Sequence, residues 1–273
     1  MLLGRGSVAG SRPAGRRWAK RFPAPLVVFA GAVAAWELAV RLAGIPAYVV
    51  PPPSALLVEL WVRPGMFLTA TLSTIGEALA GLAVAFLVAS AFAVAALRSR
   101  PLDRLLTPLV VVSQTIPVIT LAPLLVLWFG YGPTPRIIVC ALVAFFPLAV
   151  NVLSGLRSAD PDLLLLLRSV DASWWAVFRR VRVPSAGPYL AAGLRTGATL
   201  ALVGAVVAEW TGAGRGLGYI VLSANSRLAT AQAFAAVFVI CLLGLAAYGL
   251  VGLFEKRFGW WKRTATTTER NIP

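Results

Sequence analysis

Apolar runs of about 20 residues, separated by short polar segments, recur along most of the chain. A helix of this length spans the hydrocarbon core of a bilayer, so each run predicts a transmembrane helix. The six predicted helices lie at residues 26–42, 71–97, 105–129, 137–156, 189–208 and 234–254. The pattern therefore predicts an all-α polytopic membrane protein.

The segments between the runs complete the predicted organisation. A basic tail at 1–25 precedes the first helix at 26–43 and a loop at 44–70. A core domain of five helices follows at 71–254, and a polar segment at 157–188 lies within it. A second tail covers 255–273. In the first loop, the sequence Pro-Pro-Pro-Ser at 51–54 prevents a continuous helix, because proline fixes φ and lacks a donor. We expect this loop to end in a short interfacial helix.

The distribution of positive charge predicts the orientation in the membrane. Nineteen Lys and Arg residues lie on the side that holds both termini and the 157–188 segment, and only five lie on the opposite side. Because cytoplasmic loops carry the excess of Lys and Arg, both termini are expected to be cytoplasmic. The net charge of +15 then faces the anionic lipid of the inner leaflet, which argues against a role in nucleic-acid binding.

Composition excludes several other classes of protein. With 59% apolar and 13% charged residues, the chain is not an ordinary soluble domain. It contains no His, and its two Cys lie inside apolar runs, so the residues that a metal site or a Ser/His/Asp triad requires are missing. An intramembrane enzyme is therefore disfavoured, and no cofactor is expected. The chain also lacks a phosphate-binding loop that ends in Lys and Ser or Thr, so any energy from ATP must come from another subunit.

The polar segment at 157–188 carries the strongest functional signal. Asp160 is placed to cap a helix that begins at Pro161, and a second short helix is predicted after Asp171, with Trp174 and Trp175 near its start. Exposed aromatic residues are unfavourable unless they meet another surface. The segment either docks on a partner or folds back on its own helices and the lipid headgroups.

This segment resembles the cytoplasmic loop of the inner-membrane permeases of ATP-binding-cassette importers. That loop has Glu-Ala-Ala, three residues, Gly, nine residues and then Ile-x-Leu-Pro, and the matching positions here are Leu165, Leu166, Leu167, Asp171, Val181, Val183 and Pro184. Leu165 replaces the acidic residue, so docking is expected to be more apolar. Asp171 replaces the glycine, and Asp is among the least costly substitutes in a left-handed turn. The resemblance implies coupling to an ATPase through Leu165, Leu166, Leu167, Arg168, Asp171, Ala172, Ser173, Trp174, Trp175 and Pro184.

Other motifs narrow the resemblance to the branch that handles nitrate, sulfonates, taurine and pyrimidine precursors. They are Val-Pro-Pro-Pro-Ser at 50–54, Thr-Ile-Pro at 115–117, Leu-Trp-Phe-Gly-Tyr-Gly at 127–132, Gly-Leu-Arg-Ser at 155–158, Val-Ala-Glu at 207–209 and Gly-Leu-Gly-Tyr at 216–219. The resemblance implies a bacterial inner-membrane permease that works as a dimer, expected to be a homodimer, with two ATPase subunits and an external solute-binding protein. A pyrimidine precursor of thiamine is the favoured solute, and sulfonate, taurine, nitrate and riboflavin stay open.

Polar residues inside the predicted helices suggest where a solute passes. Such residues are costly in hydrocarbon and usually face a bundle interior or a cavity. We expect Gln114, Thr115, Asn151 and Glu209 to line the translocation path. For the first three, hydrogen bonding between helices is an equally good interpretation.

A secondary transporter or channel that needs no ATPase is the alternative from another class. Such a protein ought to carry intramembrane acids that relay ions. Only Glu77 and Glu209 could serve in this way, and both lie near the ends of predicted helices.

Overall fold

The computed structural model describes residues 24–113, 115, 117–211 and 214–258, and the secondary structure in these residues is entirely helical. The chain divides into two units, Met1–Ile45 and Pro46–Pro273, and each is described by itself. The described part of the first unit is helix α1 (Ala24–Leu42), which coincides with the first predicted span. On its surface, Arg41 pairs with Glu37 at 2.6 Å, one helical turn away.

The second unit begins with the predicted loop and its short helix. The prolines at 51–53 lead into α2 (Pro53–Val62), so the expected short helix is confirmed. Helix α3 (Pro64–Arg98) begins at Pro64 rather than at residue 71, because proline is well suited to the first turn of a helix. At 35 residues, α3 is longer than the predicted second span.

The third predicted span, at 105–129, is not one continuous helix in the structure. The structure has two helices there, α4 (Arg100–Ser113) and α5 (Val118–Phe129), which are bent by 99° relative to each other. Pro117 stands at the N-cap of α5, where it cannot donate a backbone hydrogen bond and disfavours a helical conformation in the preceding residue. The proline therefore marks the start of α5 and is incompatible with one continuous helix from Arg100 to Phe129.

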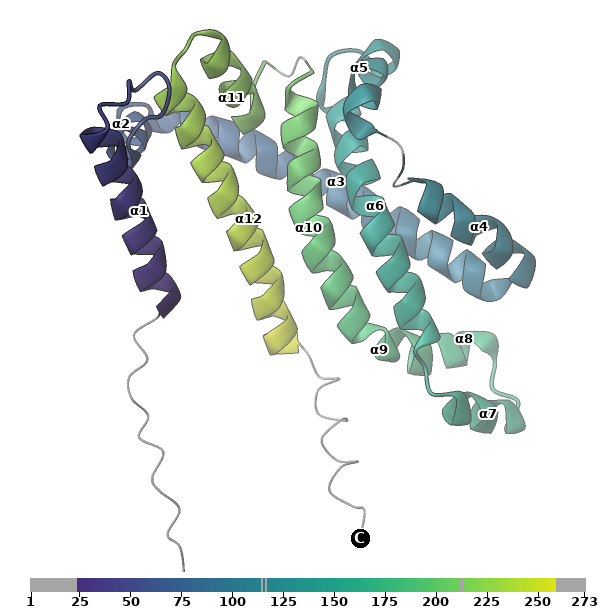
Figure 1. The fold of residues 1–273 in the computed structure, drawn as a ribbon. Helices are drawn as coiled ribbons and strands as arrows, with labels where there is room; N and C mark the ends of the chain where they lie inside the picture. Colours follow the sequence, from purple (N-terminus) through teal and green to yellow (C-terminus); the bar gives the residue numbers. More distant parts are fainter. Residues whose placement is uncertain (1–23, 114, 116, 212–213, 259–273) are drawn as a thin grey trace, which may run out of the picture. The chain divides into compact units, whose positions relative to one another are not determined.

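The other long helices are α6 (Pro133–Arg157), α10 (Gly187–Glu209) and α12 (Thr230–Phe258). The shorter α7 (Pro161–Ser169), α8 (Trp174–Val177), η1 (Phe178–Arg182) and α9 (Val183–Ser185) lie at one end of the second unit, and α11 (Leu217–Ser226) lies at the other (Figure 1). Among the described residues, α3, α6, α10 and α12 are each apolar and long enough to cross a membrane, and the α4–α5 pair brings the total to five at most. Six spans and the side of the termini stay predictions.

Helix α6 is the centre of the second unit, because it makes the most extensive helix contacts with both α10 and α3. Small residues permit this packing. Cys140 of α6 is fully buried, and a Cβ atom at Gly204 of α10 would lie 3.0 Å from its Cα. A Cβ atom at Gly81 of α3 would overlap the Cys140 side chain. In lipid the hydrophobic effect does not drive helices together, so this close backbone approach supplies much of the packing energy.

Helix α12 packs on α10 and α11 but leaves most of its surface free in the single chain. Its contact with α10 includes an ion pair of 2.6 Å between Arg195 and Glu255. The guanidinium carbon of Arg195 also lies 4.7 Å from the centre of the Tyr248 ring. The free apolar surface of α12 suits a helix that faces lipid or another subunit.

We predict that Gly81→Ala lowers the thermal stability of the purified chain. The new methyl group would collide with the Cys140 side chain and crowd the backbone of Ala141, and such overpacking costs about 1 to 3 kcal/mol. Gly249→Ala is the matched control, because no atom lies within 4 Å of its new Cβ and alanine favours the helix. Melting of both variants in detergent checks this, and equal melting temperatures would contradict the packing argument.

Candidate functional site

The segment at 157–188, called the coupling segment below, starts as the sequence predicts. The side chain of Asp160 accepts a hydrogen bond of 2.9 Å from the backbone N–H of Asp162, and Pro161 occupies the first position of α7. This cap satisfies one of the donors that a helix start leaves unpaired. None of the residues of α7 is buried.

A left-handed residue separates α7 from α8. Asp171 has φ +49°, the conformation that glycine adopts most easily. Its N–H donates to the carbonyl of Arg168 at 3.1 Å, and the N–H of Ala172 donates to the carbonyl of Leu167 at 3.0 Å. These two bonds close the Schellman motif that ends many helices. The predicted turn is confirmed, with Asp in place of glycine.

After this turn, α8 presents a stack of aromatic rings. Ser173 caps the helix by accepting a hydrogen bond of 3.3 Å from the N–H of Ala176. The ring centre of Phe178 lies 5.1 Å from that of Trp174 and 5.5 Å from that of Trp175. Arg98, the last residue of α3, holds its guanidinium over the Trp174 ring at 5.4 Å. The stack therefore touches the end of a long core helix.

Two further contacts hold the coupling segment to the core, and a third closes the segment on itself. Arg182 donates a hydrogen bond of 3.0 Å to the carbonyl of Leu156, and burial lowers the pKa of Arg182, with the charge of Arg168 contributing. The hydroxyl of Ser158 donates to the carbonyl of Ser185 at 3.3 Å. An ion pair of 2.5 Å joins Arg157 to Asp103 of α4.

The outer face of the coupling segment is apolar and uncovered in the single chain. Leu165 is 61% exposed, Val170 67% and Trp175 60%. A pocket of about 420 Å³ lies beside this face, and its lining residues are Ser173, Trp175, Ala176, Arg179 and Arg180. Exposed apolar surface rimmed by charge is typical of a protein interaction site.

At the opposite end of the unit, a buried ion pair joins α3 to α6. Glu77 accepts a hydrogen bond from Arg136, and both side chains are only 6% exposed. Ser73 also donates to Glu77 at 3.1 Å, and Arg136 donates to the carbonyl of Gly132 at 3.0 Å. The pair therefore neutralises a charge that each partner could not keep alone in this environment.

Glu209, at the end of α10, holds the start of α11. Its carboxylate accepts hydrogen bonds from the Thr74 hydroxyl at 2.6 Å and from the N–H of Gly218 at 2.5 Å. The Thr74 hydroxyl in turn accepts one from the N–H of Leu217 at 3.0 Å. A Cβ atom at Gly216, where φ is +107°, would overlap the carboxylate. This fully buried acid thus caps α11 and joins α3, α10 and α11.

The structure does not bring Thr115, Asn151 and Glu209 of the predicted path into contact with one another. Gln114 lies outside the described residues. Thr115 is exposed, and its hydroxyl donates to the carbonyl of Val112 at 2.8 Å. Asn151 is half-buried, donates to the carbonyl of Pro147 at 2.8 Å and packs against Gly193. Path lining stays a prediction for these residues.

Sequence reasoning missed two members of the buried polar network, Thr74 and Arg136. Arg136 is one of the five positive charges that the sequence places on the side opposite the termini, but it lies in the first turn of α6 and is buried. A positive charge near the positive N-terminal end of a helix is unfavourable. Its presence there indicates that an acidic side chain compensates the charge. Thr74 gave no such signal, because its partners come from three separate elements.

Comparison with known proteins identifies the family. A model of the family described as "Binding-protein-dependent transport system inner membrane component" matches residues 81–260. The chain belongs to this family. It is therefore a multi-pass permease of the bacterial inner membrane and of the ATP-binding-cassette type.

Individual relatives agree with this assignment. The permease is 34% identical to a probable ABC transporter permease protein of Haemophilus influenzae over 86% of this chain and 96% of the relative. It is 34% identical to a riboflavin transport system permease of Chloroflexus aurantiacus, over 83% of this chain and 85% of the relative. It is 32% identical to a formylaminopyrimidine transport permease of Halalkalibacterium halodurans, over 88% and 96%.

A solved structure shares the fold. One chain in the crystal structure of an amino acid ABC transporter with histidines matches with a TM-score of 0.60 and 19% identity, covering 74% of this chain and 98% of that one. At this identity the likeness shows the fold alone.

We predict that Glu77→Gln destabilises the permease by about 3 to 5 kcal/mol, because it leaves Arg136 buried without a countercharge. The double variant Glu77→Gln/Arg136→Met is expected to regain most of this loss. Asp103→Asn, which breaks the exposed pair with Arg157, is the control and is expected to cost less than about 1 kcal/mol. Thermal melting of the purified variants checks the order, and an equal loss in all three would contradict it.

Proposed function

We propose that the chain is the membrane-spanning subunit of an ATP-driven importer for a small organic solute. The observation that carries this proposal is the geometry of the coupling segment in a chain of this family. A helix, a left-handed turn at Asp171 and an exposed aromatic face stand where the family pattern lies. A separate ATPase dimer supplies the energy, because the sequence has no phosphate-binding loop of its own.

In this proposal the ATPase covers the apolar face of the coupling segment. Docking would bury Leu165, Leu166 and Val170 of the α7 region and Trp175 of α8, all of which are more than half exposed in the single chain. Apolar burial is worth about 25 cal/mol per Å², so covering these side chains offsets the cost of leaving them in water. With Leu165 in the position of an acidic residue, docking depends on packing more than on charge.

The other partners follow from the same assembly. We propose a second copy of the permease, an external solute-binding protein that delivers the solute, and surrounding lipid. Free apolar surface on α12 and on α5, where Leu127 and Trp128 are exposed, supports contact with lipid or a second copy. We place the path near the break between α4 and α5, with Gln114, Thr115 and Asn151 beside it, and assign Glu209 to the cap of α11.

The solute is a small organic molecule in this proposal. Relatives named for formylaminopyrimidine and riboflavin transport are 32% and 34% identical to this chain. A taurine transport system permease of Escherichia coli is 31% identical over 82% of this chain and 85% of its own length. The motifs favour a pyrimidine precursor as the solute. The identities of the relatives alone support an organic anion equally well.

A secondary transporter is the less favoured alternative. It would need an intramembrane acid that is free to exchange ions. Glu77 is paired with Arg136, and Glu209 accepts two hydrogen bonds that hold α11. Both of the acids considered for such a relay therefore have structural partners.

We predict that Asp171→Pro abolishes solute-stimulated ATP hydrolysis in the assembled importer, whereas Asp171→Gly preserves it. Proline fixes φ near −65° and cannot adopt the φ of +49° found at Asp171, but glycine can. ATPase activity of the purified complex, with and without loaded binding protein, is the measurement. Full stimulation in Asp171→Pro would remove the coupling segment from the mechanism.

We predict that a cysteine at position 179 reacts only with a reagent that reaches the cytoplasm, whereas one at position 215 reacts from outside. The basis is the excess of Lys and Arg on one side of the membrane. Cys241 is exposed and should first be changed to Ala, and the buried Cys140 can remain. Labelling of intact cells with a membrane-impermeant maleimide tests the topology, and efficient labelling at 179 would reverse it.

A further inference from the structure

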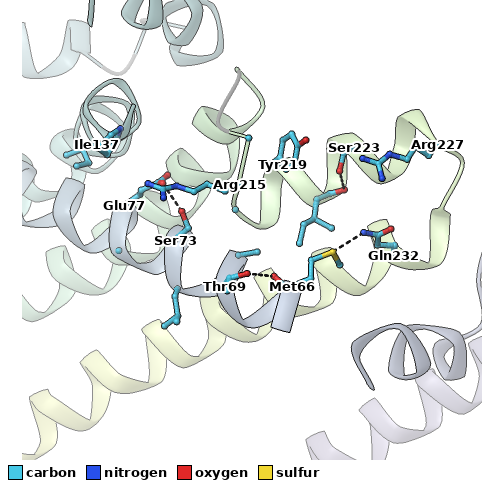
Figure 2. Close-up of a pocket in the computed structure, with 17 residues that line it drawn as sticks. Met66, Thr69, Ser73, Glu77, Ile137, Arg215, Tyr219, Ser223, Arg227 and Gln232 are labelled. Atoms are coloured by element: carbon cyan, nitrogen blue, oxygen red, sulfur yellow. Dashed lines mark hydrogen bonds between the residues drawn. The ribbon is translucent and has the colours of Figure 1, made fainter. Parts of the chain in front are cut away.

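Three long helices of the second unit, α3, α10 and α12, enclose an apolar groove. Helices α3 and α12 both pack on α10 but make little contact with each other. They meet near the end that is predicted to be external, where the side-chain amide of Gln232 on α12 donates to the sulfur of Met66 on α3 at 3.5 Å. Both residues line a pocket of about 710 Å³ that Glu77 and Tyr219 also line (Figure 2). Beyond this contact the groove lies between the two helices.

The groove has a volume of about 290 Å³, and all of its lining residues are Ala, Val, Leu or Ile. Leu79 of α3 and Leu250 of α12, which line it from either side, are 60% and 65% exposed. Leu202 of α10, which also lines it, is buried. The groove is therefore closed by α10 and open on the opposite side.

A polar cluster without net charge closes the end of the groove that is predicted to be cytoplasmic. Arg195 precedes the lining residue Ala198 by about one turn of α10, and its guanidinium forms an ion pair of 2.6 Å with Glu255 of α12. The same guanidinium lies 4.7 Å from the centre of the Tyr248 ring. Because Glu255 neutralises Arg195, this end of the groove does not select a charged ligand. An uncharged hydrocarbon group fits both the lining and the closed end.

The dimensions of the groove suit a lipid chain and not a helix. Along α12 the lining extends from Leu243 to Val251, a length of about 12 Å at 1.5 Å per residue. A helix of this length and about 10 Å in diameter occupies roughly 900 Å³, about three times the volume present. The groove is also short enough to lie within one leaflet, because the hydrocarbon core of a bilayer is about 30 Å thick.

We propose that this groove binds one acyl chain of a phospholipid from the leaflet that is predicted to be cytoplasmic, with the headgroup beside the pair of Arg195 and Glu255. The hydrophobic effect does not drive this binding, because the surrounding lipid tails are equally apolar. The gain is dispersion contact, since the lining of an empty groove lacks partner atoms. The chain fills the space between α3 and α12, and recognition depends on the acyl chain and not on headgroup charge. The site is independent of what the permease transports.

A phospholipid with a photoactivatable diazirine in the middle of one acyl chain tests the site in lipid nanodiscs that hold the full-length permease. Mass spectrometry locates the adducts, and their yield is normalised to that on Leu127, an exposed residue of α5 outside the groove. Adducts are expected on Leu79 and Leu250. Ala247→Phe places a ring in the groove and is expected to lower their yield by about threefold or more, which corresponds to roughly 0.7 kcal/mol. Ala83→Phe, at an exposed position of α3 outside the groove, is the control and should label as the parent does.

Two further measurements accompany this comparison. If Ala247→Phe does not fold, Ala246→Phe replaces it, because Ala246 lines the groove from an exposed position. Phosphatidylethanolamine and phosphatidylglycerol probes with the same chains are expected to label the groove equally, within about twofold, because Glu255 neutralises Arg195.

Three results would overturn the acyl-chain site. They are absence of adducts on Leu79 and Leu250 in the parent, equal yields in Ala247→Phe and Ala83→Phe, and a preference of more than about twofold for phosphatidylglycerol. If the adducts are absent and a cysteine at position 250 forms a disulfide between two copies of the chain, the groove is an interface between subunits and the lipid assignment is wrong.

Discussion

The second unit depends on the close approach of α6 to both α3 and α10. Small residues make this approach possible, since Gly81 and Gly204 leave room for Cys140 between the two neighbouring helices. Fully buried alanines, among them Ala89, Ala144 and Ala201, fill the rest of the core. Because lipid is as apolar as these side chains, the stability of the bundle comes from contact distance and not from exclusion of water. A single added methyl group at the helix crossing therefore matters.

Close packing also buries charged side chains, and the buried polar network supplies their partners. Helices that approach this tightly bury Glu77, Arg136 and Glu209, so each of these polar groups needs a protein partner. Arg136 neutralises Glu77. The two carboxylate oxygens of Glu209 accept hydrogen bonds from the Thr74 hydroxyl and from the N–H of Gly218 at the start of α11. The position of α11, and with it one wall of the pocket lined by Glu77 and Tyr219, is thus set by a carboxylate at the end of the preceding long helix, α10.

Local signals in the sequence predicted those parts whose cause is local. The apolar runs placed the middle of each long helix, Asp160 and Pro161 marked the start of α7, and Asp171 marked the left-handed turn. These features depend on propensities within a few residues. The docking face of the segment stays a prediction, because its partner is another chain.

Features that depend on distant residues were not predicted. The division of the 105–129 span into α4 and α5 was not predicted, because the sequence alone does not show whether neighbouring helices restore the hydrogen bonds that Pro117 removes. Burial of Arg136 depends on Glu77, which lies 59 positions away. The pocket lined by Glu77 and Tyr219 likewise brings together residues from α3, α6, α11 and α12, so no single stretch of sequence predicts it.

The coupling segment is tied to three core helices at once, and this arrangement has a mechanical consequence. Arg98 of α3 lies on Trp174, Arg182 is bonded to the end of α6, and Arg157 joins the same end to Asp103 of α4. A displacement of α8 imposed by a partner would therefore pull on α3, α6 and α4 together. Since α4 is separated from α5 by a proline break, it can tilt without moving α5 as a rigid extension.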